Sequence, residues 1–406
     1  MTATRREFIK TVGAAIASSQ FPLEPAAVVP MAASTAKPGP VPPAGGRRKV
    51  IYDQDNSGPF SANILGTLMM LQADNIELLG ITLVTGEAWM KQEMAFTLRL
   101  LELMGRTEIP VYPGAQFPLI NTKEEWLLRL QLYGGHRPDP SLGAFHPSNG
   151  GPDQIAPLPS PYDRFANVEA QQDHAARFIS KTVRENPGEV TLYAGGPLTN
   201  LALAIALAPD IISLVSEVVI LGTGFHAYTN TFNMFFDPEA ARKVLRAPWP
   251  RCSIVPVDLA EQVHETDEIA PGRSLVEEIA NRAESPISDL FRRYAVGSHK
   301  SLSRMGDEMI AAQVIDPSIF TASQAMYVDI CSTPGPRYGD SMFWPENWQE
   351  APVPLSAADR RVFVDPHQFY MGPPPSAGLV NVLLAIDRDR FKKLFVDLMT
   401  KPIERT

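Results

Sequence analysis

The sequence predicts an α/β fold in which a mostly parallel central sheet is flanked by helices within a single large domain. From Lys49 onward, short apolar strands alternate with helical segments, the order typical of parallel sheets with right-handed crossovers. The 406 residues are 45% apolar and 20% charged, which is the composition of a globular chain with a large core. No internal repeat interrupts the alternation.

The first five elements follow from the pattern of apolar residues. VIYDQD, starting at Val50, predicts a buried strand, ILGTLMMLQA a helix and IELLGITLVTG a second strand. WMKQEMAFTLRLLELMG has apolar residues at helical spacing and ends at Gly105, before the short strand IPVYPG. Ligands bind such sheets beyond the carboxyl ends of the strands. Asp53 and Asp55, at the end of the first strand, are therefore expected at the ligand-binding edge.

The second part of the chain begins with a segment that interrupts the alternation of strands and helices. Residues 115–165, rich in Pro and Gly, predict an insertion beside the site, either a lid or a surface decoration. The alternation then resumes with AARFISKTVRENPG, EVTLYAGG, PLTNLALAIALAP and EVVILGTG. Asp237 is a good N-cap for a helix that begins with Pro, and CSIVPVDL predicts a further strand. We then expect a mostly helical stretch to about residue 316, strands at YVDICST and RRVFVDP, and a closing helix ending in VDLMT.

The charge and the cysteines exclude several classes of partner. A net charge of -9 argues against nucleic acids and anionic membranes, which require clustered Lys and Arg. Cys252 and Cys331 are too few for a disulfide framework and lack metal-ligand spacing, so we expect both to be buried small hydrophobes. Apart from the N-terminus, no apolar run is long enough to cross a bilayer, so we expect no stable membrane anchor.

The N-terminus has the pattern of a targeting signal. TRREFIK, at Thr4–Lys10, precedes the weakly apolar TVGAAIASS and resembles a twin-arginine export signal; the alternative is an ordinary basic amphipathic segment. We expect a signal peptide over residues 1–36, a Pro- and Gly-rich linker over 37–47 and the folded domain over 48–400. The expected location is therefore periplasmic or secreted.

Four segments together resemble the inosine-uridine type nucleoside hydrolases. They are the first strand ending in Asp-x-Asp, AGGPLTNLALAIALAPDI, NTFNMFFDPEAA, and DEMIAAQVIDPSIF followed by YVDI. Their order and spacing match the family over roughly Lys49–Leu398, which is more specific for the fold than for the activity. The resemblance implies a nucleoside hydrolase-like fold, an N-glycosidase acting on a small nucleoside-like substrate, and a homo-oligomer.

The resemblance also implies a Ca²⁺ ion held by oxygen ligands at the strand ends. Asp55 matches a carboxylate that is both metal ligand and general base, and Asp53 a supporting carboxylate grouped with the substrate-binding residues. Gly195 matches the backbone carbonyl ligand, and Asp307 the late Asp that completes the shell. In the family the ion acidifies a water, the base accepts its proton, and the water attacks the anomeric carbon. The alternative is that Asp53 and Asp55 cap a loop without metal.

Several substrate positions depart from the family pattern. Asn233 matches an Asn that binds the ribose hydroxyls, but Glu87 replaces a second such Asn and Thr231 replaces a Glu. Asn230 is either part of this polar surface or an ordinary turn residue. Trp89 is expected to pack in the core, with stacking on a substrate ring as the alternative.

The leaving-group acid of the family has no counterpart in the alignment. Gly306 stands where many members have His. His174, His226 and His299 are candidate replacements, although each is better explained as a surface or packing residue.

The role of Asn63 depends on how the loop after Asp55 is aligned with the family. Without a gap, the family's two further carboxylates fall on Pro59 and Phe60; with three inserted residues they fall on Ala62 and Asn63, which keeps the following helix in register. Asn63 is then either a neutral metal ligand or a helix cap, and the two roles are compatible. With only two charged ligands left, calcium affinity should be weak.

Two functions therefore remain open. The first is an exported metal-dependent hydrolase of N-ribosides, supported by Asp53, Asp55, Asn233 and Asp307. The second is a non-catalytic relative that binds a small nucleoside-like ligand, supported by the lost carboxylates.

Overall fold

The computed structural model describes residues 46–133, 142–225, 231–262, 273–282, 284–296, 305–347, 373–374 and 376–403. All of them belong to one compact unit. Several predictions lie outside these residues: the signal peptide, most of the linker, the strand at RRVFVDP, Asn230, His226 and His299.

Nine strands of the described residues form one sheet, in the order β3-β2-β1-β4-β5-β6-β9-β7-β8. Neighbouring strands are parallel from β3 to β9, whereas β7 is antiparallel to both β9 and β8. The mostly parallel sheet is thus confirmed. The strands are β1 (Arg48–Gln54), β2 (Ile76–Leu83), β3 (Val111–Pro113), β4 (Val190–Ala194), β5 (Glu217–Leu221), β6 (Cys252–Val255), β7 (Phe320–Ile330), β8 (Ser341–Pro345) and β9 (Gly378–Ile386).

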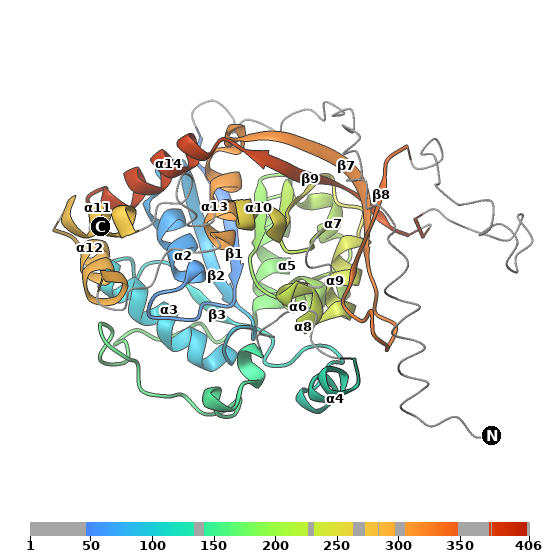
Figure 1. Cartoon of the computed structure of the whole chain (residues 1–406), viewed down its shortest axis with the longest axis horizontal. Coiled ribbons are helices and arrows are strands. Elements are labelled where there is room, and N and C mark those ends of the chain that lie inside the picture. The colour runs from blue at the N-terminus through green and yellow to red at the C-terminus, as the bar shows by residue number, and fades with distance from the viewer. Residues whose placement is uncertain are drawn as a thin grey trace, which may run out of the picture. The chain divides into compact units, whose positions relative to one another are not determined.

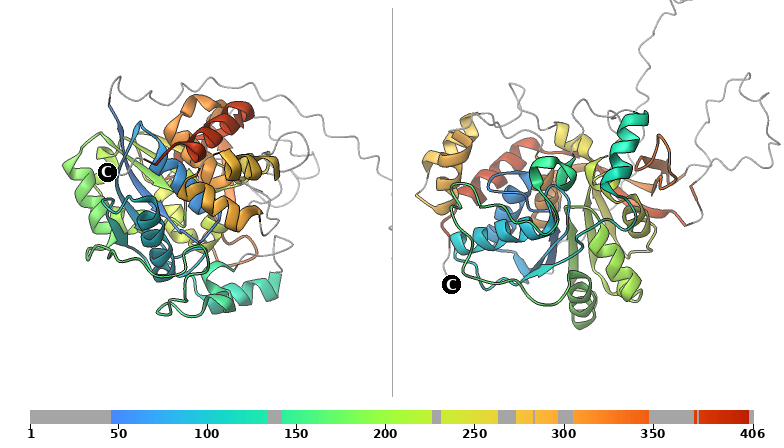
Figure 2. Two further views of the ribbon diagram at one scale, coloured as in Figure 1. Left: turned by 90° about the vertical axis from the view of Figure 1, so that its left-hand side faces the viewer. Right: turned by 90° about the horizontal axis from the view of Figure 1, so that it is seen from below.

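Helices cover both faces of the sheet (Figure 1, Figure 2). They are α2 (Ala62–Gln72), α3 (Met90–Met104), α4 (Lys123–Tyr133), α5 (Ala175–Glu185), α6 (Thr199–Leu207), α7 (Ile211–Leu214), α8 (Phe232–Phe236), α9 (Pro238–Leu245), α10 (Val257–Gln262), α11 (Arg273–Arg282), α12 (Pro286–Leu290), α13 (Gly306–Ile315) and α14 (Arg388–Thr400). Single-turn 3-10 helices occur at η1 (Gly143–Phe145), η2 (Pro147–Asn149) and η4 (Pro317–Ile319), and a π-helical turn at η3 (Phe291–Val296).

The alternation of side chains along β1 explains the two layers. Val50 and Tyr52 pack into a core with α2, α3 and α10–α14, whereas Ile51 packs into a second core with α5, α6, α7 and α9. Because successive residues of a strand point to opposite faces, a strand covered on both sides must be apolar throughout. This is why the buried parallel strands could be recognised in the sequence.

The order in which strands are added to the sheet reverses beside β1, and this reversal positions the site. The connection from β1 leads to β2 and β3 on one side, while β4, β5 and β6 lie on the other. Asp53 pairs with Ala194, and the Gly195 amide donates to the Asp53 carbonyl at 2.9 Å. The carboxyl ends of β1 and β4 therefore meet at a topological switch point, where open α/β sheets bind ligands.

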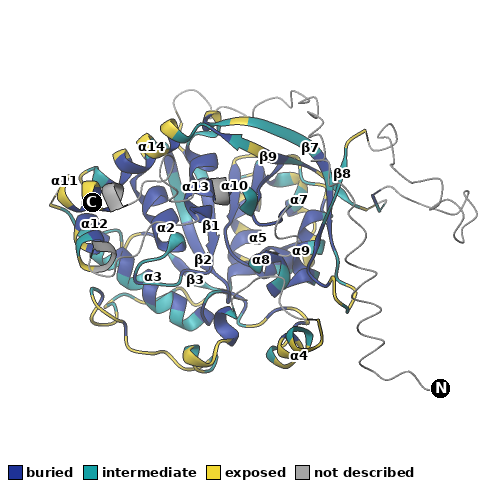
Figure 3. Cartoon of the chain, viewed as in Figure 1, coloured by how far each residue is buried: buried dark blue, intermediate teal, exposed yellow. Residues whose placement is uncertain are grey.

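The predicted insertion contains α4, η1 and η2. It is anchored by an aromatic cluster of Trp89, Trp126, Phe145 and Phe236, while the rest of α4 is mostly exposed (Figure 3). The helix α4 was not predicted.

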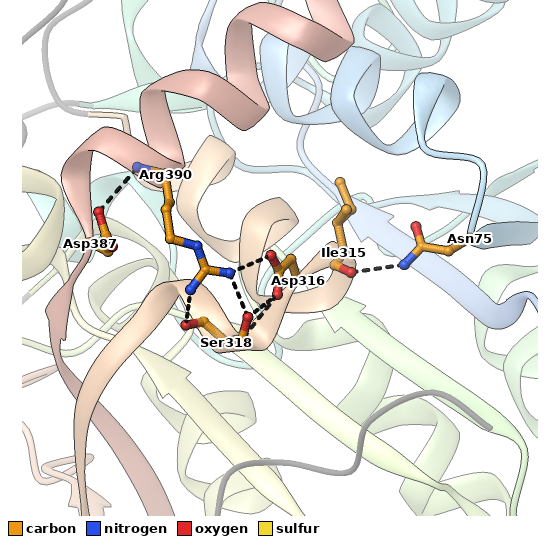
Figure 4. Close-up of polar contacts among 6 residues, drawn as sticks. All are labelled: Asn75, Ile315, Asp316, Ser318, Asp387 and Arg390. Carbon is orange, nitrogen blue, oxygen red and sulfur yellow. Dashed lines mark hydrogen bonds and ion pairs between the residues drawn. The ribbon is translucent and has the colours of Figure 1, made fainter. Parts of the chain in front are cut away.

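Two sets of polar contacts hold the C-terminal end of α13 (Figure 4). Asn75 donates to the carbonyl of Ile315 at 2.8 Å, and Arg390 of α14 reaches Asp316 at 3.0 Å. These contacts fix the C-terminal end of α13, and Asp307 lies in the first turn of the same helix.

The cysteine prediction is only partly confirmed. Cys252 is buried in β6, but Cys331 is partly exposed, so the expectation was wrong for Cys331. Within the described part of the chain, no helix combines the length and the apolar character needed to cross a bilayer.

Candidate active site

A cavity of about 190 Å³ opens at the carboxyl ends of β1, β4 and β5. It brings together seven of the predicted site residues: Asp55, Asn63, Glu87, Gly195, Thr231, Asn233 and Asp307. The rest of the lining is small or apolar: Ala62, Leu221, Gly222, Phe232, Val257, Ala260 and Gly306. The predicted residues thus converge from segments far apart in the sequence.

Asp55 is a buried carboxylate on the cavity wall, with 1% of its surface exposed. One oxygen accepts from Asn63 Nδ2 at 2.9 Å and the other from the Glu87 amide at 3.0 Å. A Cβ at Gly86 would lie 2.1 Å from Asp55 Oδ2, so only glycine fits there. Burial raises the Asp55 pKa well above its ordinary value, and the carboxylates of Glu87 and Asp307 add to this shift. A nearby cation would oppose it and favour the ionised base.

Asp53 lies below the cavity and is not among the residues that line it. Its Oδ1 accepts from Thr82 Oγ1 at 2.5 Å and from Asn200 Nδ2 at 2.7 Å. Burial raises its pKa to about 7, against the effect of these two hydrogen bonds. Its grouping with the substrate-binding residues stays a prediction; in this structure Asp53 ties the ends of β1 and β2 to α6.

Asn63 is not the cap of α2. The N-cap is Ser61, whose side chain accepts from the Ile64 amide at 3.3 Å. The Nδ2 of Asn63 instead donates to Asp55 Oδ1 and to Gln54 Oε1, at 2.9 and 3.3 Å. The capping interpretation is wrong because the inserted residues supply a Ser two positions earlier.

Gln54 is the residue that the sequence analysis missed. Its side chain is fully buried, its Nε2 donates to Asp307 Oδ1 at 2.7 Å, and its Oε1 accepts from the Asp55 amide at 2.9 Å. The only signal in the sequence was a polar residue at the end of a buried strand, between two carboxylates.

Asp307 enters the cavity from the first turn of α13. Burial raises its pKa to about 7; the hydrogen bond from Gln54 lowers it and the Glu87 carboxylate raises it. Like Asp55, it is a buried acid whose ionisation a cation would favour.

Gly195 and Asn233 meet on the opposite wall. Asn233 Nδ2 donates to the Gly195 carbonyl at 2.6 Å and to the Leu221 carbonyl at 3.1 Å. Both amide hydrogens are therefore used, which leaves Oδ1 as the group that can accept from a sugar hydroxyl.

The remaining predicted residues have mixed roles. Thr231 lines the cavity, but its Oγ1 accepts from the Thr223 amide at 3.0 Å, which holds the loop after β5. Trp89 is buried, stacks edge-on against Phe145 and donates to the Gly150 carbonyl at 3.2 Å. The core-packing interpretation of Trp89 is supported, since it is not a lining residue.

The insertion supports the loop that carries Glu87. The Ala144 amide donates to the Gly86 carbonyl at 2.8 Å, and Asn149 Nδ2 donates to the Glu87 carbonyl at 3.3 Å. It is therefore part of the cavity's support rather than a surface decoration.

A leaving-group acid is not found among the described lining residues, none of which is His, Lys or Arg. Gly306 lines the cavity, as the alignment suggested. His174 is the N-cap of α5, accepting from the Ala176 amide at 3.1 Å, which explains it without catalysis.

The oxygen atoms that face the cavity belong to the chemical types that bind a hard cation. Asp55 and Asp307 supply carboxylates, Asn63 an amide oxygen and Gly195 a carbonyl, the ligands that Ca²⁺ prefers. In the described ranges no three His, Cys, Asp or Glu side chains group as a metal site.

Comparisons with known proteins identify the family of the chain. The model of the inosine-uridine preferring nucleoside hydrolase family matches residues 50–393. The pyrimidine-specific ribonucleoside hydrolase RihB of Escherichia coli is 27% identical over 305 residues, covering 72% of this chain and 86% of RihB. An uncharacterized protein of Schizosaccharomyces pombe is 32% identical over 222 residues, which are 53% of this chain and 63% of that protein.

Solved structures show the same fold. A plant nucleoside hydrolase, the PpNRh1 enzyme, aligns with a TM-score of 0.64 at 22% identity, over 87% of this chain and 99% of its own. An inosine-guanosine nucleoside hydrolase aligns with a TM-score of 0.64 at 23% identity, over 87% and 99%. Since the family model covers most of the sequence, the chain belongs to the inosine-uridine preferring nucleoside hydrolase family, whose members hydrolyse the N-glycosidic bond of nucleosides.

Proposed function

We propose that the protein is a calcium-dependent hydrolase that cleaves the N-glycosidic bond of a ribonucleoside or a related N-riboside. The observation that supports this most directly is the convergence of Asp55, Asn63, Gly195, Asp307 and Asn233 on one cavity at the switch point of the sheet.

Each residue of the site is assigned the role in the reaction that its chemical group can perform. Asp55, held by Asn63 and the Glu87 amide, accepts the proton of the attacking water while the water oxygen bonds to the anomeric carbon. The bond between the anomeric carbon and the nucleobase nitrogen breaks, and the nucleobase leaves with the electron pair of that bond. Asn233 Oδ1 accepts from a sugar hydroxyl, and Phe232 and Val257 supply apolar contact for the base.

Asp55, Asn63, Gly195 and Asp307 are the groups that would hold the ion. When bound, calcium supplies the positive charge that acidifies water and keeps nearby carboxylates ionised. Two carboxylates leave the shell less charged than the family pattern, so we expect weak affinity, suited to the calcium outside the cytoplasm.

We also propose that the chain is exported by the twin-arginine route to the periplasm or the medium. The support is the sequence TRREFIK before a weakly apolar stretch. Replacing Arg5 and Arg6 by Lys should retain the protein inside the cell, as cell fractionation would show. The homo-oligomer implied by the family is likewise a proposal, which light scattering would test.

Calcium titration by calorimetry, with a ribose-release assay over a panel of nucleosides, tests the main proposal. We expect binding and release, both lost in Asp55→Ala. The matched control is Asp329→Asn, a fully buried carboxylate that pairs with Arg246 away from the cavity and should retain both. Calcium binding without release from any nucleoside would favour the non-catalytic ligand-binding alternative. No binding at millimolar calcium would reject the metal site.

A further inference from the structure

The side chain of Gln54 lies against all four residues proposed to hold calcium. Its Nε2 donates to Asp307, and its Oε1 accepts from the Asp55 amide and from Asn63 Nδ2. It also packs against Gly195: a Cβ on that glycine would lie 2.3 Å from Gln54 Nε2. One fully buried amide thus joins segments that begin or end at β1, α2, β4 and α13.

The orientation of the Gln54 amide is determined by its surroundings. A backbone amide can only donate, so the atom that faces the Asp55 amide at 2.9 Å must be the oxygen. The nitrogen then faces Asp307 Oδ1, which as a carboxylate accepts. A flipped amide would oppose donor to donor and acceptor to acceptor, so this arrangement is the only one that satisfies both neighbours.

This orientation restricts the residue at position 63. Two acceptors face the Asn63 amide nitrogen, Gln54 Oε1 at 3.3 Å and Asp55 Oδ1 at 2.9 Å. Asparagine supplies two donors there, whereas an ionised aspartate supplies none and would meet both oxygens with its own. The loss of a carboxylate at position 63 is therefore matched to the presence of Gln54.

We propose that Gln54 is the positioning residue of this site: it selects which oxygen atoms of Asn63 and Asp307 face the cavity, and it requires a hydrogen-bond donor at position 63. The proposal rests on the proposed calcium site but concerns how the protein's own groups are held. With Asn63 Nδ2 and Asp307 Oδ1 engaged inside the protein, Asn63 Oδ1 and Asp307 Oδ2 are the oxygens that would face a cation. Asn63 Oδ1 also accepts from Ser61 Oγ at 3.3 Å, which occupies one of its two lone pairs. Such pre-organisation reduces the ordering that binding must impose.

A double-mutant cycle tests the coupling in calcium-free protein. The variants are Asn63→Asp, Gln54→Thr and the two combined; threonine is shorter and its hydroxyl can donate or accept. We expect Asn63→Asp to lower the Tm at least 3 °C more in the Gln54 background than in the Gln54→Thr background. Additive changes in Tm would overturn the proposal. If Gln54→Thr does not fold, Gln54→Asn, which cannot span the same distance, should give non-additivity of the same sign.

Calcium affinity separates positioning from ordinary packing. Gln54→Thr should raise the calcium Kd at least tenfold although every proposed ligand is still present. The matched control is Gln72→Thr, a buried amide of α2 that donates to the Lys401 carbonyl at 2.9 Å; it should lower the Tm and leave the Kd unchanged. An unchanged Kd in Gln54→Thr would contradict the positioning role. If the wild type binds no calcium, the proposed function fails and the Tm cycle alone decides the role of Gln54.

Discussion

Asn233 shows how hydrogen bonding assigns a role to each atom of a side chain. Its two amide hydrogens are used by the carbonyls of Gly195 and Leu221, so the substrate can meet only its oxygen. The alignment identified the residue, but only the structure shows that it acts as an acceptor.

Truncating Asn233 should therefore weaken substrate binding. We expect Asn233→Ala to raise the KM for a cleaved nucleoside about tenfold, the loss of one hydrogen bond worth about 1.4 kcal/mol. The control is Asn186→Ala, since Asn186 Nδ2 donates to the Thr182 carbonyl at 3.0 Å at the end of α5 and the residue does not line the cavity. A wild-type KM in Asn233→Ala, measured by steady-state kinetics, would remove Asn233 from the sugar site.

Glu93 illustrates a buried acid that is better neutral. It is fully buried on α3, accepts from the Ala88 amide at 2.9 Å, and leaves Oε2 without a partner among the described atoms. Burial raises its pKa well above the ordinary value, and the Asp55 carboxylate adds to the shift. The ionised form is thus penalised in the fold.

Glu93→Gln keeps the acceptor and removes the charge. We expect the calcium-free variant to be at least as stable as the wild type at pH 8, because the penalty for ionisation is gone. Glu93→Leu, which loses the acceptor, should cost about 1 to 3 kcal/mol. Chemical denaturation at pH 8 measures both, and a clear loss of stability in Glu93→Gln would mean that the charge itself is needed.

The buried Trp126 of α4 packs against α8, whose residues form part of the cavity wall. Trp126 is 1% exposed and packs on Phe235 with ring centroids 4.4 Å apart, and on Phe232, which lines the cavity, at 6.2 Å. The insertion therefore supports the cavity wall from outside the sheet.

Removing this anchor should affect both stability and binding. We expect Trp126→Ala to cost about 3 to 5 kcal/mol, the range for a large buried aromatic residue, and to raise KM because Phe232 loses its support. Leu128→Ala on the same helix, at a residue 51% exposed, should change stability by no more than about 0.5 kcal/mol. Urea unfolding and steady-state kinetics would check both, and equal effects of the two changes would show that α4 is not anchored through Trp126.

Across the whole molecule, the parallel half of the fold was predictable and the last strands were not. The strands β1–β6 are apolar runs between helices, a pattern produced by burial on both faces. The strands β8 and β9 were missed because both are only partly buried, so neither is a continuous buried apolar run. In the sheet β8 pairs with β7, and β9 lies between β6 and β7, parallel to the first and antiparallel to the second. The convergence of site residues could be predicted from the resemblance. Gln54 could not, because its partner Asp307 is 253 residues away.

The buried carboxylates give the molecule a common pH dependence, which Asp237 allows us to test away from the proposed metal. Its side chain accepts from the Leu119 amide at 2.8 Å, from Thr199 Oγ1 at 2.7 Å and from the Ala240 amide at 3.1 Å, joining the insertion to α6 and α9. Burial raises its pKa to about 6, against these hydrogen bonds.

Because the folded pKa of Asp237 lies above the unfolded value of 3.8, the folded state binds the extra proton between about pH 4 and pH 6. The stabilisation of the folded state by protonated Asp237 is complete below that window and is lost as the pH rises through 6. The contribution is on the order of 3 kcal/mol. Asp237→Asn is neutral throughout, so its stability should fall less steeply over this window than that of the wild type, while the other acids affect both proteins alike. Denaturant unfolding of the calcium-free proteins from pH 4 to pH 8 would measure the difference. Parallel curves would mean that Asp237 is ionised in the folded state across the whole range, and that its three hydrogen bonds outweigh its burial.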